Sequence, residues 1–311
     1  MKLAFLYAGQ GSQKTGMGRD LYEEFPSIRS CFENKSAGFD LKELCFEAPL
    51  EVLSKTRYTQ PCMAAIAMAI TKLLYDEGIY PSYAAGLSLG EYSALYASGV
   101  FDDDSLISIL AFRGKVMEET TANIKSKMCA VFNLSEERIM EAIDKVNSLN
   151  LGVVACANFN CPGQIVIGGE EKAVDAAAEI CKRMGAKRCV PLNVSGPFHT
   201  PLMEEASVLL GERLEQTKLY DMSFSVVFNS TADILGDGET IPHILKKQIK
   251  SPVLFEKTIY RLRSMGVDTI IEIGPGRVLS GFVRKTAPEI VSYTIEDVES
   301  FYKTVKAVKS A

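Results

Sequence analysis

The stretch Gly86-Leu87-Ser88-Leu89-Gly90 lies between a short run of small and aromatic residues (83–85) and a segment of helical composition (91–97). This order predicts a strand, a sharp turn and a helix, with Ser88 at the apex of the turn. The flanking glycines let the backbone turn tightly without a Cβ clash. So short a pattern also recurs by chance, and its alternative is an ordinary Gly-Ser turn, so the interpretation depends on the surrounding motifs.

The composition indicates a globular protein of one large or two modest domains, with 311 residues of which 47% are hydrophobic and 23% charged. The net charge is −5, and no long basic run appears, which argues against a nucleic-acid partner. Eight Cys without a Cys-x-x-Cys pair, together with only two His, argue against a zinc site and indicate reduced thiols. We therefore expect a cytoplasmic protein with no metal and no membrane-spanning segment.

The first expected strand (3–8) runs into the glycine-rich loop Gly9-Gln10-Gly11-Ser12-Gln13. This loop does not match a nucleotide site, because Lys14 replaces the third glycine of a dinucleotide motif and no Gly-Lys-Ser/Thr follows. A glycine-rich loop still brings backbone N–H groups close to a ligand. The remaining alternative is that it donates to an oxyanion.

Residues 127–194 change character and predict a βαββαβ order, typical of a ferredoxin-like unit, whose last strand spans 188–194. On both sides of this segment strands and helices alternate, which favours a parallel sheet with crossover helices. We therefore predict an α/β fold with an α/β-hydrolase-like catalytic subdomain (1–126 and 195–311) and an inserted ferredoxin-like subdomain (127–194). Within the large part, 19–60 reads as surface helices and loops. A long apolar helix is expected from Gln60-Pro61 to Tyr75, with Pro61 at the first helical position.

Arg113 lies on the apolar face of a helix that the cluster Asp102-Asp103-Asp104-Ser105 is expected to start. Its neighbours at helical spacing are Leu106, Ile109, Leu110, Val116 and Met117. A guanidinium on such a face must either find an anion or keep its charge in water at the edge of the stripe. Snorkelling, an ion pair with a nearby Glu and a ligand carboxylate remain the alternatives.

His199 lies just before a helix that is expected to start at Pro201 with Thr200 as its cap. The partial positive charge of a helix N-terminus disfavours the imidazolium, which would leave the ring available as a base near neutral pH. The alternative is a structural histidine in a turn. The other histidine, His243, has no comparable surroundings.

Taken together, these pieces resemble the malonyl-CoA:acyl carrier protein transacylases over nearly the whole chain. Seven motifs in the right order are far more specific than any one of them. The matching segments are Gly9 to Gln13, Gly86 to Tyr92, the Arg113 helix, Ala157 to Gln164, Gly196 to Met203, Gln248 with Ser251 to Phe255, and Glu272 to Gly276.

The resemblance implies that Ser88 is the nucleophile that becomes malonylated and that His199 takes its proton. Backbone N–H groups of Gln10 and Leu89 would form the oxyanion hole. Arg113 would hold the malonyl carboxylate through a bidentate pair that Lys could not copy.

Further positions follow from the same resemblance. The backbone carbonyl of Gln248 would orient the His ring, giving a Ser-His dyad without a carboxylate. Phe198, Asn158 and Asn160 would line the substrate pocket, and Phe198 is similar to the malonyl-selective variant. Leu87 stands where many members have His, which affects fine tuning of the rate but not the reaction.

The implied activity is a ping-pong transfer of malonyl from coenzyme A to the phosphopantetheine thiol of an acyl carrier protein, for fatty acid synthesis. Malonyl-CoA and the carrier protein would be the substrates, with no further cofactor, and we expect a monomer. The alternatives are a serine esterase or thioesterase, in which water is the acceptor, and a catalytically silent carrier-binding module. Basic residues at 182–188 and 246–250 are candidates for docking an acidic carrier, or else ordinary solvated faces.

Overall fold

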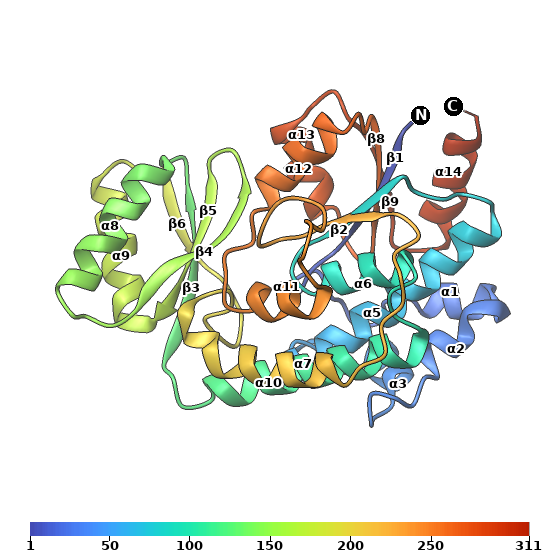
Figure 1. The fold of residues 1–311 in the computed structure, drawn as a ribbon, viewed down its shortest axis with the longest axis horizontal. Helices are drawn as coiled ribbons and strands as arrows, with labels where there is room; N and C mark the ends of the chain where they lie inside the picture. Colours follow the sequence, from blue (N-terminus) through green and yellow to red (C-terminus); the bar gives the residue numbers. More distant parts are fainter. Residues whose placement is uncertain (311) are drawn as a thin grey trace.

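The computed structural model describes residues 1–310 and contains two separate β-sheets with helices packed around them (Figure 1). The larger sheet is parallel, and its strands in spatial order are β7 (Ser225–Val227), β2 (Tyr83–Gly86), β1 (Leu3–Tyr7), β8 (Thr269–Ile273) and β9 (Val291–Ile295). The smaller sheet is antiparallel, and its strands in spatial order are β4 (Val154–Cys161), β5 (Gln164–Glu170), β3 (Ser126–Phe132) and β6 (Arg188–Pro191). A mixed α/β fold with a parallel sheet, as the sequence predicts, is thus present.

Strand β1 lies at the centre of the parallel sheet, and all five of its side chains are buried. Phe5 and Tyr7 belong to the apolar cluster under α5 (Thr56–Asp76), α6 (Gly90–Ala97) and α7 (Asp103–Thr121). Ala4 and Leu6 belong to the cluster under α12 (Phe255–Ser264) and α13 (Val278–Thr286) on the other face. Because both faces are covered, the strand reads as a continuous apolar run rather than an alternating one.

Helix α5 begins at Thr56, so the expected start at Gln60-Pro61 was wrong. Residues 56–60 supply a first turn of helix ahead of Pro61. At that position proline forfeits only the bond that its N–H would have made to the Arg57 carbonyl. The extra turn buries Thr56, Thr59 and Gln60.

The smaller sheet is formed by consecutive elements in the order β3, α8 (Glu136–Ser148), β4, β5, α9 (Glu171–Arg183) and β6. Both helices cover the face of this sheet that points away from the parallel sheet (Figure 1), over an apolar cluster of their own. Strand β6 ends at Pro191 rather than at 194; it lies at the sheet edge, where a proline is tolerated although it has no N–H to donate. The segment before α12 joins the two sheets: Phe159 N donates to Val253 O at 2.8 Å, and Val253 N to Ala157 O at 2.9 Å.

The segment 19–60 forms short helices that are partly buried, which corrects its interpretation as surface structure. They are α1 (Arg19–Glu24), α2 (Arg29–Phe32), α3 (Leu41–Phe46) and α4 (Leu50–Leu53). Leu21, Phe32 and Cys45 from these helices are each 0% exposed. Their apolar side chains pack in the same cluster as α5.

The C-terminal part contains α10 (Glu204–Glu215), α11 (Ile241–Gln248) and α14 (Val298–Lys309). Strand β9 and helix α14 were not predicted. The Thr200 hydroxyl donates to Pro197 O at 2.6 Å instead of capping a helix, and a 3-10 turn, Pro201–Met203, precedes α10. Among residues 1–310, no helix combines the length and apolar character needed to cross a membrane.

Candidate active site

Ser88 stands at the turn between β2 and α6 with a φ of 56°. The two glycines of the motif are required by close packing. A Cβ at Gly86 would lie 2.0 Å from the Gly90 carbonyl carbon, and a Cβ at Gly90 would lie 2.2 Å from Tyr7 O. Helix α6 therefore starts directly against β1 and β2, which leaves Ser88 at the edge of the sheet.

The backbone of the turn is held by the side chain of Asn229. Its Nδ2 donates to Gly86 O at 2.7 Å, and its Oδ1 accepts from Ser88 N at 2.7 Å. Asn229 is itself held, because its backbone N–H donates to the buried carboxyl of Glu91. A positive φ at a residue other than glycine costs on the order of 1–3 kcal/mol, so these bonds help to keep Ser88 in place. Asn229 and Glu91 were not predicted from the sequence; the available signal for Asn229 was a polar residue directly after the apolar run of β7.

His199 contacts Ser88 on one side and the backbone of Gln248 on the other. Its Nε2 lies 2.7 Å from Ser88 Oγ, and its Nδ1 lies 2.9 Å from Gln248 O. A carbonyl oxygen can only accept, so Nδ1 carries the proton and Nε2 offers its lone pair to the serine hydroxyl.

Burial is the main cause that lowers the pKa of His199 to about 4, followed by the positive charge of Arg113. The imidazole is therefore neutral at pH 7, as a base must be. From the sequence, the same direction of the pKa shift was expected from the positive end of a helix that starts next to His199. In the structure α10 begins only at Glu204, so the shift comes from burial and a neighbouring charge.

The side chain of Arg113 is 1% exposed, which excludes snorkelling. Its Nη1 donates to Gln60 Oε1 at 2.8 Å, and its Nη2 to Gln248 Oε1 at 3.0 Å and to Ser88 Oγ at 3.2 Å. The guanidinium also lies over the ring of Tyr92, 5.2 Å from its centroid. Within residues 1–310 no carboxylate forms an ion pair with it.

Gln248 contacts Ser88, His199 and Arg113. Besides its contacts with His199 and Arg113, its Nε2 donates to Ser88 O at 2.8 Å. The side chain is 0% exposed and comes from the last residue of α11. The side-chain amide of Gln248 bonds Arg113 and Ser88, and its backbone carbonyl bonds His199, so this one residue fixes the relative positions of the other three.

The two expected oxyanion donors are unengaged. In the described part of the chain, neither the N–H of Gln10 nor that of Leu89 donates to another group of the protein. The Gln10 side chain donates to Thr56 Oγ1 at 3.1 Å, and Ser12 Oγ donates to Gly9 O at 3.0 Å. The loop after β1 is therefore ordered by its side chains while the backbone donors remain available.

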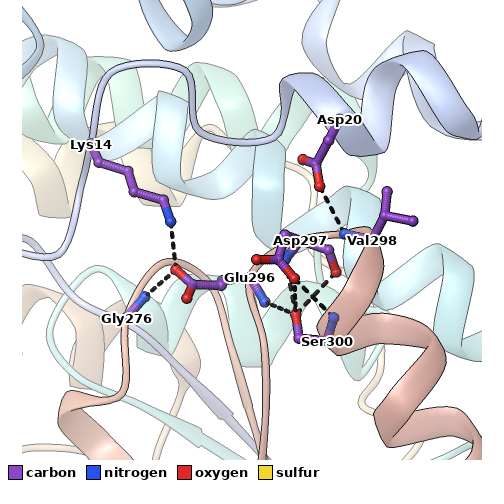
Figure 2. A network of polar contacts seen from close by, with 7 residues as sticks. All are labelled: Lys14, Asp20, Gly276, Glu296, Asp297, Val298 and Ser300. Atoms are coloured by element: carbon purple, nitrogen blue, oxygen red, sulfur yellow. Dashed lines mark hydrogen bonds and ion pairs between the residues drawn. The ribbon is translucent and has the colours of Figure 1, made fainter.

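A polar network at the far end of this loop ties it to the loops after β8 and β9 (Figure 2). Lys14 Nζ lies 2.7 Å from Glu296 Oε2, and the same oxygen accepts from Gly276 N at 3.1 Å. Further along, the Asp20 carboxylate accepts from Val298 N at 2.8 Å. The segment that carries Gln10 is thus anchored to two neighbouring strand ends.

A cavity of about 240 Å³ lies beside Ser88 and His199, between the two sheets. From the small sheet it is lined by Met128, Ala130, Asn158, Asn160 and Val166. From the large region it is lined by Gln10, Phe198, Val278, Leu279 and Phe282. Asn160 is 6% exposed and its Oδ1 has no hydrogen-bond partner within residues 1–310, so it can accept from a bound molecule.

The structure thus brings the residues singled out in the sequence to one place. Ser88, His199, Arg113 and Gln248 touch one another, while Gln10, Phe198, Asn158 and Asn160 line the cavity. Leu89 follows the serine directly.

His243 lies apart from this site, exposed on α11. Gln60 was missed, and its signal was a lone amide in an apolar helix. Among the residues described, no cluster of His, Cys, Asp or Glu is suited to a metal ion.

Comparisons with known proteins give a consistent result. Residues 4–306 match the family model described as an acyl transferase domain. The malonyl CoA-acyl carrier protein transacylase of Bacillus subtilis is 39% identical over 310 residues, covering 99% of this chain and 98% of that protein. The protein of the same name from Escherichia coli K12 is 34% identical over 299 residues, covering 95% and 96%.

Two solved structures are similar over the full chain. The malonyl CoA-acyl carrier protein transacylase of Clostridium perfringens superimposes with a TM-score of 0.95 at 38% identity, covering 100% of this chain and 98% of that one. The second is PlMCAT:AntF, a type II PKS acyl-carrier protein in complex with its malonyl-transacylase. It gives a TM-score of 0.94 at 37% identity, with 99% and 100% covered.

Proposed function

The chain belongs to the acyl transferase family, among the malonyl CoA-acyl carrier protein transacylases, and on that basis we propose that it transfers malonyl from malonyl-CoA to the phosphopantetheine thiol of an acyl carrier protein. The family resemblance found in the sequence motifs is confirmed by these matches. The observation that carries the chemistry is the 2.7 Å contact between His199 Nε2 and Ser88 Oγ.

In the first half-reaction Ser88 Oγ attacks the thioester carbonyl while its proton passes to His199 Nε2. The carbonyl oxygen becomes an oxyanion, and the N–H groups of Gln10 and Leu89 donate to it. When the C–S bond breaks, the proton on Nε2 passes to the sulfur of coenzyme A, which leaves as a thiol. The malonyl group is then an ester of Ser88.

The second half-reaction runs the same steps in reverse with another thiol. His199 takes the proton of the carrier's phosphopantetheine thiol, and the sulfur attacks the ester carbonyl. Collapse of the oxyanion breaks the C–O bond and returns the proton to Ser88. His199 keeps one tautomer throughout because Nδ1–H remains bonded to Gln248 O.

The malonyl carboxylate is recognised by Arg113, whose Nη2 lies 3.2 Å from Ser88 Oγ and so faces the point where the acyl chain is attached. A planar guanidinium can bind a carboxylate through two parallel bonds. Phe198 limits the space beside the acyl group, and Asn158 and Asn160 contact the more distant part of the substrate.

We assign docking of the carrier protein to clusters of basic side chains on the surface; a carrier protein is bound to a similar transacylase in the PlMCAT:AntF complex. The clusters at 182–188 and 246–250 are the candidates. Lys182 already pairs with Glu179 and Lys250 with Glu204. An acidic carrier would have to compete with those pairs, so its turnover should fall as salt rises.

The finer description of the fold is part of the same proposal. The spatial order β4-β5-β3-β6 of a βαββαβ unit supports a ferredoxin-like subdomain at 127–194, inserted into an α/β-hydrolase-like part at 1–126 and 195–311. We further assign the protein to the cytosol as a monomer that needs no cofactor. Its eight cysteines are all free, which supports a reducing compartment.

The competing function is a thioesterase with the same serine and histidine. The two are separated by measuring release of coenzyme A from malonyl-CoA with and without a carrier protein bearing its phosphopantetheine arm. We expect release to continue past one equivalent only when the carrier is present, with one malonyl-carrier formed per coenzyme A. Sustained release without carrier would establish hydrolysis instead.

A further inference from the structure

Arg113 presents an unusual electrostatic arrangement, because a fully buried guanidinium has only neutral partners in the protein. Its donors go to the amide oxygens of Gln60 and Gln248 and to the hydroxyl of Ser88. Buried charges are normally paired with an opposite charge, since removal from water is costly. The positive charge of Arg113 is therefore held in place but not cancelled.

Gln60 is committed to this contact by its surroundings. It is 1% exposed, on the apolar helix α5, and its Nε2 faces Met117 Sδ at 3.3 Å. Because a guanidinium can only donate, the carbonyl end of the amide must point toward Arg113. The amide nitrogen of Gln60 is left facing the thioether sulfur of Met117, which is a weak acceptor. The one strong hydrogen bond of the Gln60 side chain is thus the bond it accepts from Arg113.

The nearby buried carboxyl of Glu91 does not compensate the charge either. Burial raises the pKa of Glu91 to about 8, with the Asn229 backbone bond and Arg113 acting in the opposite direction. At pH 7 this carboxyl is therefore mostly protonated and neutral. Its Oε2 accepts from Asn229 N, and its Oε1 has no partner among residues 1–310.

We propose that Gln60 determines acyl specificity as a positioning residue: it fixes the Arg113 guanidinium through a neutral oxygen, so that the charge stays available for the substrate carboxylate. This inference rests on the proposed function. A glutamate of nearly the same shape would hold Arg113 equally well but would cancel its charge inside the protein. The substrate carboxylate would then have to compete with a permanent partner 2.8 Å away.

The test compares Gln60→Glu with Gln60→Met, which keeps the volume and removes the hydrogen bond without adding charge. Acylation of the full-length protein is followed in single turnover by intact mass, with malonyl-CoA and with acetyl-CoA as probes. In Gln60→Glu we expect malonyl acylation to fall on the order of 100-fold, as for loss of a charge-assisted pair. Acetyl acylation should change less than about 5-fold, because that substrate has no carboxylate.

Gln60→Met should raise the KM for malonyl-CoA about 10-fold, leave kcat for acetyl-CoA nearly unchanged and keep malonyl as the preferred substrate. An unchanged malonyl-to-acetyl ratio in Gln60→Glu, or an equal fall with both substrates, would overturn the inference. If Gln60→Glu does not fold, the inference is tested with Gln60→Met, and an unchanged KM for malonyl-CoA in that variant would overturn the inference. A wild-type protein that is never malonylated would instead defeat the proposed function itself.

Discussion

The two walls of the cavity differ in how firmly their polar groups are held. On the large-region wall, Ser88 and His199 line the cavity, and Arg113 and Gln248 contact them from the protein side. Each of these four residues takes part in at least two hydrogen bonds, and three of them are almost fully buried. The small-sheet wall contributes apolar side chains together with Asn158, Gln164 and Asn160, and the amide oxygen of Asn160 is unpartnered in the described part of the chain. The difference indicates that the reacting groups are preorganised on one wall while the other shapes the space for the substrate.

The largest expected effect belongs to the base on the preorganised wall. Replacing His199 with Ala should slow acylation of Ser88 by about 1000-fold, because no other group lies in place to take the proton. Single-turnover release of coenzyme A measures this rate, and His243→Ala is the matched control with unchanged rate. A loss smaller than about 10-fold in His199→Ala would show that another base serves the serine.

Arg113→Ala should lower kcat/KM for malonyl-CoA by about 100-fold and favour acetyl-CoA in relative terms. Arg113→Lys should restore little of this, since an ammonium cannot form two parallel bonds with a carboxylate. Competition between the two acyl-CoA substrates gives the ratio directly. If the ratio in Arg113→Ala equals that of the wild type, Arg113 is a structural residue only.

The two hydrogen bonds that Asn229 makes with the turn around Ser88 predict a smaller effect, on both stability and rate. Asn229→Ala leaves Ser88 N and Gly86 O without their partners, so we expect loss of about 1–3 kcal/mol in unfolding free energy and about 10-fold in kcat. Urea unfolding and steady-state kinetics give the two values. Wild-type stability and rate in this variant would mean that the strained turn needs no support from Asn229.

Glu91 should be visible in the pH dependence of stability. Its pKa rises from the usual 4.5 to about 8 on burial, so between these values the folded protein keeps a proton that the unfolded chain has released. Stability therefore falls as pH rises across this range, by at most about 1.4 kcal/mol per pH unit from this group. Glu91→Gln should flatten the curve measured by urea unfolding from pH 5 to 8. Parallel curves for the two proteins would contradict the assignment.

The smallest effect is expected on the opposite wall. Asn160→Ala removes an acceptor that has no hydrogen-bond partner in the described part of the chain, so stability should change little and the KM for malonyl-CoA should rise only about 3-fold. Isothermal titration calorimetry with coenzyme A gives a dissociation constant as an independent measure of binding. A loss of kcat as large as that of Asn229→Ala would erase the distinction between the two walls.

The sequence was sufficient to predict most residues of the candidate site but not the buried residues that hold them in place. Ser88, His199 and Arg113 stand in motifs with fixed local geometry, and chemistry restricts which side chains can serve there. Gln60, Glu91 and Asn229 act through contacts between segments more than 50 positions apart, such as the 138 positions that separate Asn229 from Glu91. No local pattern distinguishes such an amide from an ordinary polar residue.

The fold shows the same division. Alternating strands and helices, and the change of pattern near residue 127, predicted a parallel sheet and the βαββαβ segment. Boundaries were less predictable, because Pro61 lies inside α5 and Pro191 ends β6, and local preference alone does not distinguish these cases. Strand β9 was missed since it is an edge strand with two exposed residues at its start, Val291 and Ser292, and so lacks a continuous apolar run.

The central claim is that Ser88 carries the acyl group, and weighing the intact protein after mixing with malonyl-CoA tests it most directly. We predict one malonyl adduct per chain, located on the peptide that contains Ser88, and none in Ser88→Ala. An adduct that persists in Ser88→Ala, or a wild-type protein that turns over malonyl-CoA without ever gaining mass, would contradict the account.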